Sequence, residues 1–307
     1  MNIRRLVAET LALLILERGM LRVQLNPAKG GIIDSIRWRG IELIDGEGFG
    51  RGLQVAWQYG DHGECANPTQ GGSAFDERDR PAIGHSQIQS IMRHTPYSAE
   101  VVVSPAWWVP EGPGNGSMFC EWQGKDWGPN PPYPPTEGVI GLVSQSRIRT
   151  KVRLVGQGRI NLTLAYVVNA EESANIPAQF DLVQVPYVAF LPMFTKLYRV
   201  GLDGTVSSAG EGFRPAAPIL CSAAGDTCIG WYSPAAAAQV PDPMWHNGYV
   251  GHGARDQRFQ DGCWVTYASI KVLRVPGTWQ IFSARLFVGR SVTEVAAEMV
   301  AAGWPSR

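Results

Sequence analysis

A long strand pattern begins at Arg147-Ile-Arg-Thr-Lys-Val-Arg-Leu154 and continues through Gly156-Gln-Gly158 and Ile160 to Val168. Apolar and polar residues alternate along its first part, which is the two-residue period of a β-strand with one buried face. The two glycines around Gln157 are typical of a turn, and a second apolar strand follows them. The stretch therefore predicts a long antiparallel hairpin.

Further strand patterns lie on both sides of this hairpin. Leu21, Val23 and Leu25 alternate with polar residues, and residues 35–44 read as two strands joined at Arg39-Gly40, where glycine allows the positive φ of a tight turn. Three later segments continue the β pattern: Cys228 to Tyr232, Cys263 to Val275 and Trp279 to Val288. Antiparallel hairpins of this kind predict an all-β sandwich with one polar and one apolar face per sheet.

One helix is expected near the end of the sequence. Ser291-Val-Thr-Glu294 is a capping box, in which the serine and glutamate side chains satisfy free backbone N–H groups. Apolar residues then recur at helical spacing through Val300. We expect an amphipathic helix that packs on the sandwich and carries no chemistry.

Residues 1–20 form an N-terminal lead segment with two interpretations, a short helix or a vestigial secretion signal. Its basic start and apolar run resemble a signal. Glu9 and Thr10 interrupt the run, however, and it is too short to span a bilayer. No linker or low-complexity tract divides the rest, so residues 21–307 are expected to form one domain. The compartment, cytoplasmic or secreted, stays open.

The balance of charges limits the classes of molecule that the protein is expected to bind. The 307 residues hold 27 Lys and Arg against 27 Asp and Glu, and no basic stripe stands out, which argues against nucleic acid. No membrane partner is expected, and the oligomeric state is not determined.

The five cysteines include no C-x-x-C pair, which disfavours a zinc ribbon or a redox motif. Cys221 and Cys228 flank a plausible turn and are either disulfide-bonded or reduced packing residues.

The strongest candidate for chemistry is the glycine-rich segment from Gly50 to Gly72, which reads as a loop dense in titratable groups. His62 and Glu64 are two residues apart, so on extended backbone they share one face. A histidine exchanges protons near neutral pH, and the carboxylate orients it or acts as its partner. A metal site would need Cys65 or His85 as a further ligand at irregular spacing, so no metal and no cofactor are expected.

Other residues of this segment are candidates for holding a sugar. The guanidinium of Arg51 suits a uronate carboxylate or a pair of hydroxyls. A nearby cation would also favour the phenolate form of Tyr59, which would then serve as an acid or base. Three amide side chains are candidates for binding hydroxyls: Gln54, Asn67 and Gln70.

Two other segments add aromatic and titratable residues. His246 lies in the cluster Trp245-His246-Asn247, inside a glycine-rich stretch. Residues 104–136 form a long excursion rich in tryptophan and proline, and ordered loops of such length are usually functional. A tryptophan face suits the C–H surface of a sugar ring. The candidates on this excursion are Trp108, Trp122, Trp127 and, as a catalytic carboxylate, Glu121.

Several short motifs resemble galactose mutarotase-like (aldose 1-epimerase-like) proteins, in particular an uncharacterised bacterial branch. They are the hairpin from Gly30 to Gly40, Gly50-Arg51-x-Leu53-Gln54, the run from Asn67 to Gly71, Ala106 to Pro110, and Leu182 to Tyr187. Within the last motif this chain has Val183-Gln184-Val185 where that branch has Gln-Glu before the proline. The Asn-His-x-Tyr-Phe-Asn-Leu motif of true mutarotases, which supplies their catalytic histidine, is also absent from the sequence.

The resemblance implies a single antiparallel β-supersandwich with a carbohydrate site on a concave face. Members of the class include aldose epimerases, polysaccharide lyase domains and domains of glycoside hydrolases. Only Arg51 is carried over as a site residue, because it is similar to the early substrate-binding arginine of the class.

The function expected from the sequence is cleavage of a glycosidic linkage in an oligo- or polysaccharide, as a glycoside hydrolase or a polysaccharide lyase. Acid and base groups would act in a cleft lined by tryptophans. Two alternatives remain open: a sugar epimerase similar to aldose 1-epimerase, and a glycan-binding module without catalysis. An epimerase needs less aromatic platform, and a binding module has no use for paired histidines and carboxylates.

Overall fold

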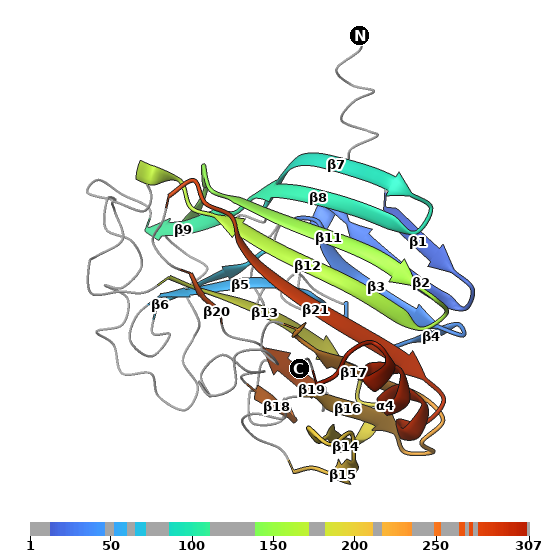
Figure 1. The fold of residues 1–307 in the computed structure, drawn as a ribbon. Coiled ribbons are helices and arrows are strands. Elements are labelled where there is room, and N and C mark those ends of the chain that lie inside the picture. The colour runs from blue at the N-terminus through green and yellow to red at the C-terminus, as the bar shows by residue number, and fades with distance from the viewer. Residues whose placement is uncertain are drawn as a thin grey trace.

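The computed structural model describes residues 13–46, 52–59, 65–71, 86–110, 139–171, 182–210, 217–234, 249–252, 264–267, 270–272 and 276–305. These residues form antiparallel β-sheets and a C-terminal helix, so the predicted fold class is confirmed (Figure 1).

The largest sheet has nine strands, in the order β15-β14-β16-β17-β21-β12-β11-β8-β7. It crosses the front of the molecule in Figure 1. Its strands, in chain order, are β7 (Gln87–Thr95), β8 (Ser98–Ser104), β11 (Arg147–Val155), β12 (Arg159–Val167), β14 (Phe194–Val200), β15 (Val206–Ser208), β16 (Pro218–Ser222), β17 (Cys228–Tyr232) and β21 (Gln280–Gly289).

Two further sheets and a small hairpin complete the β structure. The four-stranded sheet comprises β1 (Leu14–Arg18), β2 (Leu21–Asn26), β3 (Ile32–Trp38) and β4 (Ile41–Glu42), with the 3-10 turn η1 (Pro27–Lys29) between β2 and β3. The six-stranded sheet comprises β5 (Gln54–Tyr59), β6 (Cys65–Thr69), β13 (Leu182–Phe190), β18 (Tyr249–His252), β19 (Trp264–Tyr267) and β20 (Ile270–Val272). The hairpin pairs β9 (Ala106–Pro110) with β10 (Val139–Val143).

One continuous apolar core joins the three sheets. It contains Val23 and Ile36 of the four-stranded sheet, Val152 of the nine-stranded sheet, and Val55 and Phe190 of the six-stranded sheet, all exposed by 1% or less. Burial of this apolar surface is the main favourable contribution to folding. Because the core lies between the sheets, each sheet has a second face that is turned away from it.

The hairpin predicted from residues 147–168 is confirmed as β11 and β12. Their register runs without a shift from Arg147↔Val167 to Val155↔Arg159. Every second residue of β11 is buried, so the intervening cations share the outer face of the nine-stranded sheet: Arg147, Arg149, Lys151 and Arg153. From the sequence we expected no basic stripe. This one was missed because its cations are interleaved with core residues.

The start of the fold differs from the expected lead segment. Leu14 to Arg18, placed in the lead segment by the sequence, form β1, which pairs along its whole length with β2. The physical reason is the alternation around Leu16, which is fully buried in the core, and the tight turn at Gly19, whose φ is 60°. The segment 1–12 lies outside the described residues.

The C-terminal helix is confirmed as α4 (Val292–Ala301). The Ser291 hydroxyl accepts a hydrogen bond from the Glu294 N–H at 3.1 Å, and the Glu294 carboxylate accepts one from the Arg290 N–H at 2.8 Å. The helix lies on the outer face of the nine-stranded sheet, where Val295 and Met299 pack against β16, β17 and β21 (Figure 1). No helix among the described residues has the length and apolarity needed to cross a membrane.

Cys221 and Cys228 face each other across β16 and β17 and form a disulfide. The sequence left this pairing open against two reduced cysteines. Both residues are 1% exposed or less and lie in the small apolar cluster beneath α4.

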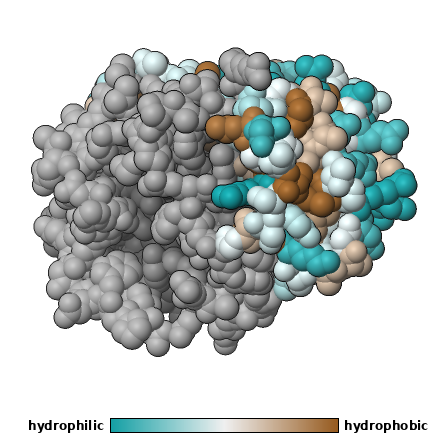
Figure 2. Space-filling model, turned by 60° about the horizontal axis from the view of Figure 1, so that its bottom comes forward, coloured by the Kyte–Doolittle hydropathy of each residue, from teal (hydrophilic) through white to brown (hydrophobic). Residues whose placement is uncertain are grey.

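The underside of the molecule mixes apolar and polar residues in its described part (Figure 2). Leu202 and Val206, on the β14–β15 hairpin, are 61% and 38% exposed, and Val300 of α4 is 43% exposed. The turn of that hairpin lies against α4, because a Cβ atom on Gly204 would be 3.6 Å from the Val300 side chain.

Candidate functional site

The strands around the Gly50 to Gly72 segment belong to the six-stranded sheet. β5 and β6 form a hairpin in which Tyr59 pairs with Cys65, so His62 and Glu64 belong to the segment that connects these two strands. Several predicted site residues lie outside the described residues: Arg51, His62, Glu64, Glu121, Trp122, Trp127, Trp245 and His246. Their roles stay predictions.

Gln54 and Gln70 are described in full, and both are buried. Gln54 is 0% exposed, and its side-chain oxygen accepts a hydrogen bond from the Gly71 N–H at 2.8 Å. Gln70 is 1% exposed, and its side-chain nitrogen donates to the Gly30 carbonyl at 2.8 Å. Both amides therefore join the end of β6 to neighbouring backbone. Hydroxyl binding by these residues stays a prediction.

The contact between Gln70 and Gly30 requires a glycine. The backbone of Gly30 has a φ of 65°, and a Cβ atom at this position would be 2.3 Å from the Gln70 carbonyl oxygen. An L-residue is disfavoured at such a φ, and the two backbones could not approach as closely. The end of β6 is thereby held against the turn that precedes β3.

One row of the six-stranded sheet carries three tyrosines that the sequence alone does not bring together. The register pairs Gln54 with Tyr187, Tyr187 with Tyr267, and Tyr267 with Tyr249, across β5, β13, β19 and β18. Directly paired positions lie on the same face of a sheet. Val55 and Val188, which follow Gln54 and Tyr187 in their strands, belong to the core.

The hairpin of β9 and β10 lies beside the six-stranded sheet, because β9 contacts β6. Trp108 in β9 pairs with Gly141, and Asn67 lies in the middle of β6. The segment with Glu121, Trp122 and Trp127 connects the far ends of this hairpin, Pro110 and Val139. The segments with Asn67, Trp108 and Glu121 are thus all connected to β6, β9 or β10, of which β6 and β9 are in contact.

Within the described residues, no group of three or more His, Cys, Asp or Glu residues is close enough to hold an ion. The possible ligands His62, Glu64 and His85 lie outside the described residues.

No protein-family model matches the chain, and no curated protein matches its sequence. Among solved structures, the chain is similar to a protein of glycosyl hydrolase family 38 from Enterococcus faecalis, at 10% identity and a TM-score of 0.47. That match covers 95% of this chain and 32% of the other, so this chain spans about a third of that protein.

Two similar structures are closer to this chain in length. A galactose mutarotase-like protein from Clostridium acetobutylicum has 9% identity and a TM-score of 0.43, with 92% of this chain and 99% of that chain covered. A putative aldose 1-epimerase from Klebsiella pneumoniae has 10% identity and a TM-score of 0.44, with 93% and 81% covered. The likeness is remote in all three. The class that the sequence motifs resemble, the galactose mutarotase-like and aldose 1-epimerase proteins, is thus found among the solved structures similar to this chain.

Proposed function

We propose that the protein is a carbohydrate-active enzyme that cleaves a glycosidic linkage in an oligo- or polysaccharide. The glycan would lie on the face of the six-stranded sheet that is turned away from the core. The observation that carries the proposal is the register that places Tyr187, Tyr267 and Tyr249 in one row across β13, β19 and β18. Tyrosine combines an apolar ring with a hydroxyl, which suits both the C–H face and the hydroxyls of a sugar.

The dimensions of this row favour a chain of sugars over a single ring. Neighbouring strands are about 4.8 Å apart, so the three tyrosines span roughly 10 Å across β13, β19 and β18. A binding surface of this length accommodates more than one sugar ring, whereas an epimerase acting on one free sugar uses only part of it. Further sugar rings would stack on the tryptophans Trp108, Trp122, Trp127 and Trp245.

The catalytic roles follow from residue type and from connection to these strands. His62 or His246 would transfer the proton, with Glu64 or Glu121 as the carboxylate partner. Hydrolysis requires two carboxyl groups on either side of the scissile bond. Elimination instead requires a base such as His62 or Tyr59, with Arg51 neutralising the uronate carboxylate. Gln54, Asn67 and Gln70 would orient the substrate or the strands that hold it.

The test is the turnover of a glycan panel by site variants. Neutral and uronate-containing oligosaccharides are incubated with the wild type, and the loss of intact glycan is followed by chromatography. We expect His62→Ala to lower the rate by about 100-fold or more, as for removal of a general acid or base. Tyr267→Phe should lower it less, because a single hydroxyl contact is lost.

Lys151→Ala provides the matched control. Lys151 is exposed on the outer face of β11, away from the core and from the six-stranded sheet. Its variant should turn over glycans at the wild-type rate. Equal rates for the His62, Glu64 and Tyr267 variants and the wild type would exclude this face as the site of cleavage. Glycan binding with no turnover by the wild type would favour a binding module.

A further inference from the structure

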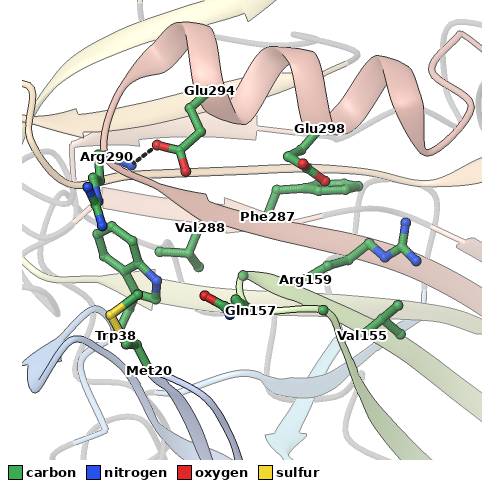
Figure 3. A pocket seen from close by; sticks show the side chains of 12 residues that line it. Met20, Trp38, Val155, Gln157, Arg159, Phe287, Val288, Arg290, Glu294 and Glu298 are labelled. Carbon is green, nitrogen blue, oxygen red and sulfur yellow. Dashed lines mark hydrogen bonds between the residues drawn. The ribbon is translucent and has the colours of Figure 1, made fainter.

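A polar cavity lies between the four-stranded sheet, the β11–β12 turn and α4 (Figure 3). Two of the elements that line it, α4 and the β11–β12 turn, lie away from β6 and β9 in Figure 1. Its volume is about 420 Å³, within the range of small-molecule sites. Its polar lining includes Trp38, Gln157, Arg159, Arg290, Glu294 and Glu298.

Close backbone packing shapes this cavity. A Cβ atom on Gly158 would be 2.3 Å from the Val288 carbonyl oxygen, so the glycine lets the β11–β12 turn lie directly on β21. The β1–β2 turn lies beside Gln157, at 3.5 Å from the position of a Cβ atom on Gly19. Arg18 donates a hydrogen bond to the Leu154 carbonyl at 3.2 Å and ties the two turns together. The cavity is thus built from fixed elements.

Two hydrogen-bond donors line this cavity. Trp38 is 3% exposed, and its indole N–H points into the cavity in Figure 3. The Nε of Arg159 is buried and has no partner among the described residues, whereas buried donors are normally satisfied. A ligand with acceptor oxygens would accept hydrogen bonds from such donors.

The charges around the cavity select the class of ligand. Arg159 and Arg290 supply cationic donors, whereas Glu294 and Glu298 supply anionic acceptors. An anion would meet the two carboxylates, and a cation would meet the two guanidinium groups. A hydroxyl group both donates and accepts, so a neutral polyhydroxylated molecule matches both kinds of group at once.

We propose that this cavity is a second carbohydrate-binding site, one that takes a neutral mono- or disaccharide. Trp38 donates its indole N–H to a sugar oxygen, Arg159 adds further donors, and Glu298 accepts from sugar hydroxyls. Phe287 and Val288 of β21 add apolar atoms to the lining of the cavity. The site goes beyond the proposed cleavage reaction and does not depend on it.

The indole N–H of Trp38 provides a direct readout. The protein is labelled with ¹⁵N at its tryptophan indoles, and its spectrum is recorded during titration with D-glucose, D-galactose, maltose and cellobiose. We expect at least one of these sugars to shift the Trp38 resonance in a saturable manner. The Trp304 indole is the internal control, because its N–H already donates to the Gly201 carbonyl at 3.2 Å, and its resonance should not move.

Assignment of the resonance uses two independent variants. Trp38→Phe removes the indole signal and keeps an aromatic ring at this position. If that variant does not fold, Arg39→Ala identifies the same signal, because it removes a guanidinium that lies 5.5 Å from the centre of the Trp38 ring.

Charged sugars and side-chain variants test whether the cavity prefers neutral sugars. Arg159→Gln should weaken sugar binding about tenfold or more, as for loss of a charged hydrogen-bond donor. D-glucuronate and D-glucosamine should bind more weakly than D-glucose. Absence of a saturable shift with all four neutral sugars would overturn the proposal, as would equal binding by the charged sugars or by Arg159→Gln. His62→Ala should bind sugar here normally, so failure of this site and failure of the cleavage proposal are distinguishable.

Discussion

At the scale of single residues, Gly30 controls the junction between η1 and the end of β6. Its φ is 65°, and a Cβ atom added to it would lie 2.3 Å from the Gln70 carbonyl oxygen, which leaves no room for a side chain. Gln54 and Gln70 then complete this junction through their hydrogen bonds to Gly71 and Gly30. The end of β6, the strand that follows the segment with His62 and Glu64, is therefore held by backbone contacts that depend on one glycine.

We predict that Gly30→Ala lowers the free energy of unfolding by about 2–4 kcal/mol, since it adds a clash with backbone to the cost of an unfavourable φ. Gly156→Ala is the matched control. It has the same φ of 65°, but nothing lies within 4 Å of its Cβ position, so it should cost only about 1 kcal/mol. Urea denaturation measures both. Equal losses in the two variants would contradict the contact with Gln70.

Asp203 gives a prediction on pH. Its carboxylate accepts hydrogen bonds from the Thr205 hydroxyl at 2.7 Å and the Thr205 N–H at 3.0 Å, and these bonds lower the pKa of Asp203 below its ordinary value. The stabilisation of the β14–β15 turn is therefore present above the ordinary pKa of an aspartate and is lost as the pH falls through the lowered value. Thr205→Val should raise the Asp203 pKa, as followed by carboxyl NMR titration. An unchanged Asp203 pKa would mean that the Thr205 hydroxyl is not what lowers it.

At the scale of elements, α4 is held by packing rather than by its own helix propensity. Gly230 in β17 makes room for it, because a Cβ atom there would lie 2.8 Å from Val295 and 2.9 Å from the Met299 sulfur. Met299 is fully buried between the helix and the sheet, whereas the adjacent Val300 is 43% exposed. The cluster beneath the helix also contains the Cys221–Cys228 disulfide.

Met299→Ala should therefore lower the free energy of unfolding by about 2–4 kcal/mol, because it leaves a cavity beneath α4. Val300→Ala, on the exposed side of the same turn, should change it by no more than about 0.5 kcal/mol. Thermal unfolding followed by circular dichroism compares the two variants. A similar effect of both substitutions would mean that α4 does not pack on the sheet as described.

The elements that the sequence predicted correctly have local signals. The alternation in residues 147–168 and the capping box at Ser291 lie within short windows, so the long hairpin and α4 were found with nearly correct ends. β1 was missed because its alternation is embedded in an apolar run that resembles a helix or a signal. The basic stripe of β11 was missed because its four cations alternate with core residues.

The site was less predictable for a physical reason. The row of Gln54, Tyr187, Tyr267 and Tyr249 arises from register between strands that are far apart in the chain, and a single sequence does not contain that register. The residue types of Gln54 and Gln70 indicated hydroxyl binding, but their burial depends on the position of Gly30 and Gly71. The composition of the loops identified the segments that carry the candidate site residues. The strand order and register, which a single sequence does not contain, identified the row on the six-stranded sheet.

At the scale of the whole molecule, two regions with different chemistry emerge. The six-stranded sheet is connected to the loops with the predicted acid and base groups, and its row of tyrosines is proposed to hold a glycan chain. The cavity beside α4 is small and mixed in charge, and it is proposed to hold a neutral sugar (Figure 3). An enzyme with both would bind its substrate at one site and a sugar unit at the other.

The protein is proposed to cleave glycosidic bonds, a claim that mass spectrometry of reaction products in H₂¹⁸O tests. The wild type is incubated with neutral and uronate-containing oligosaccharides, with boiled protein as the control. We predict shortened glycans, carrying one ¹⁸O atom if the reaction is hydrolysis and an unsaturated end without added water if it is elimination. Recovery of every glycan at its original mass would contradict the claim and leave the epimerase and the glycan-binding module as the remaining explanations.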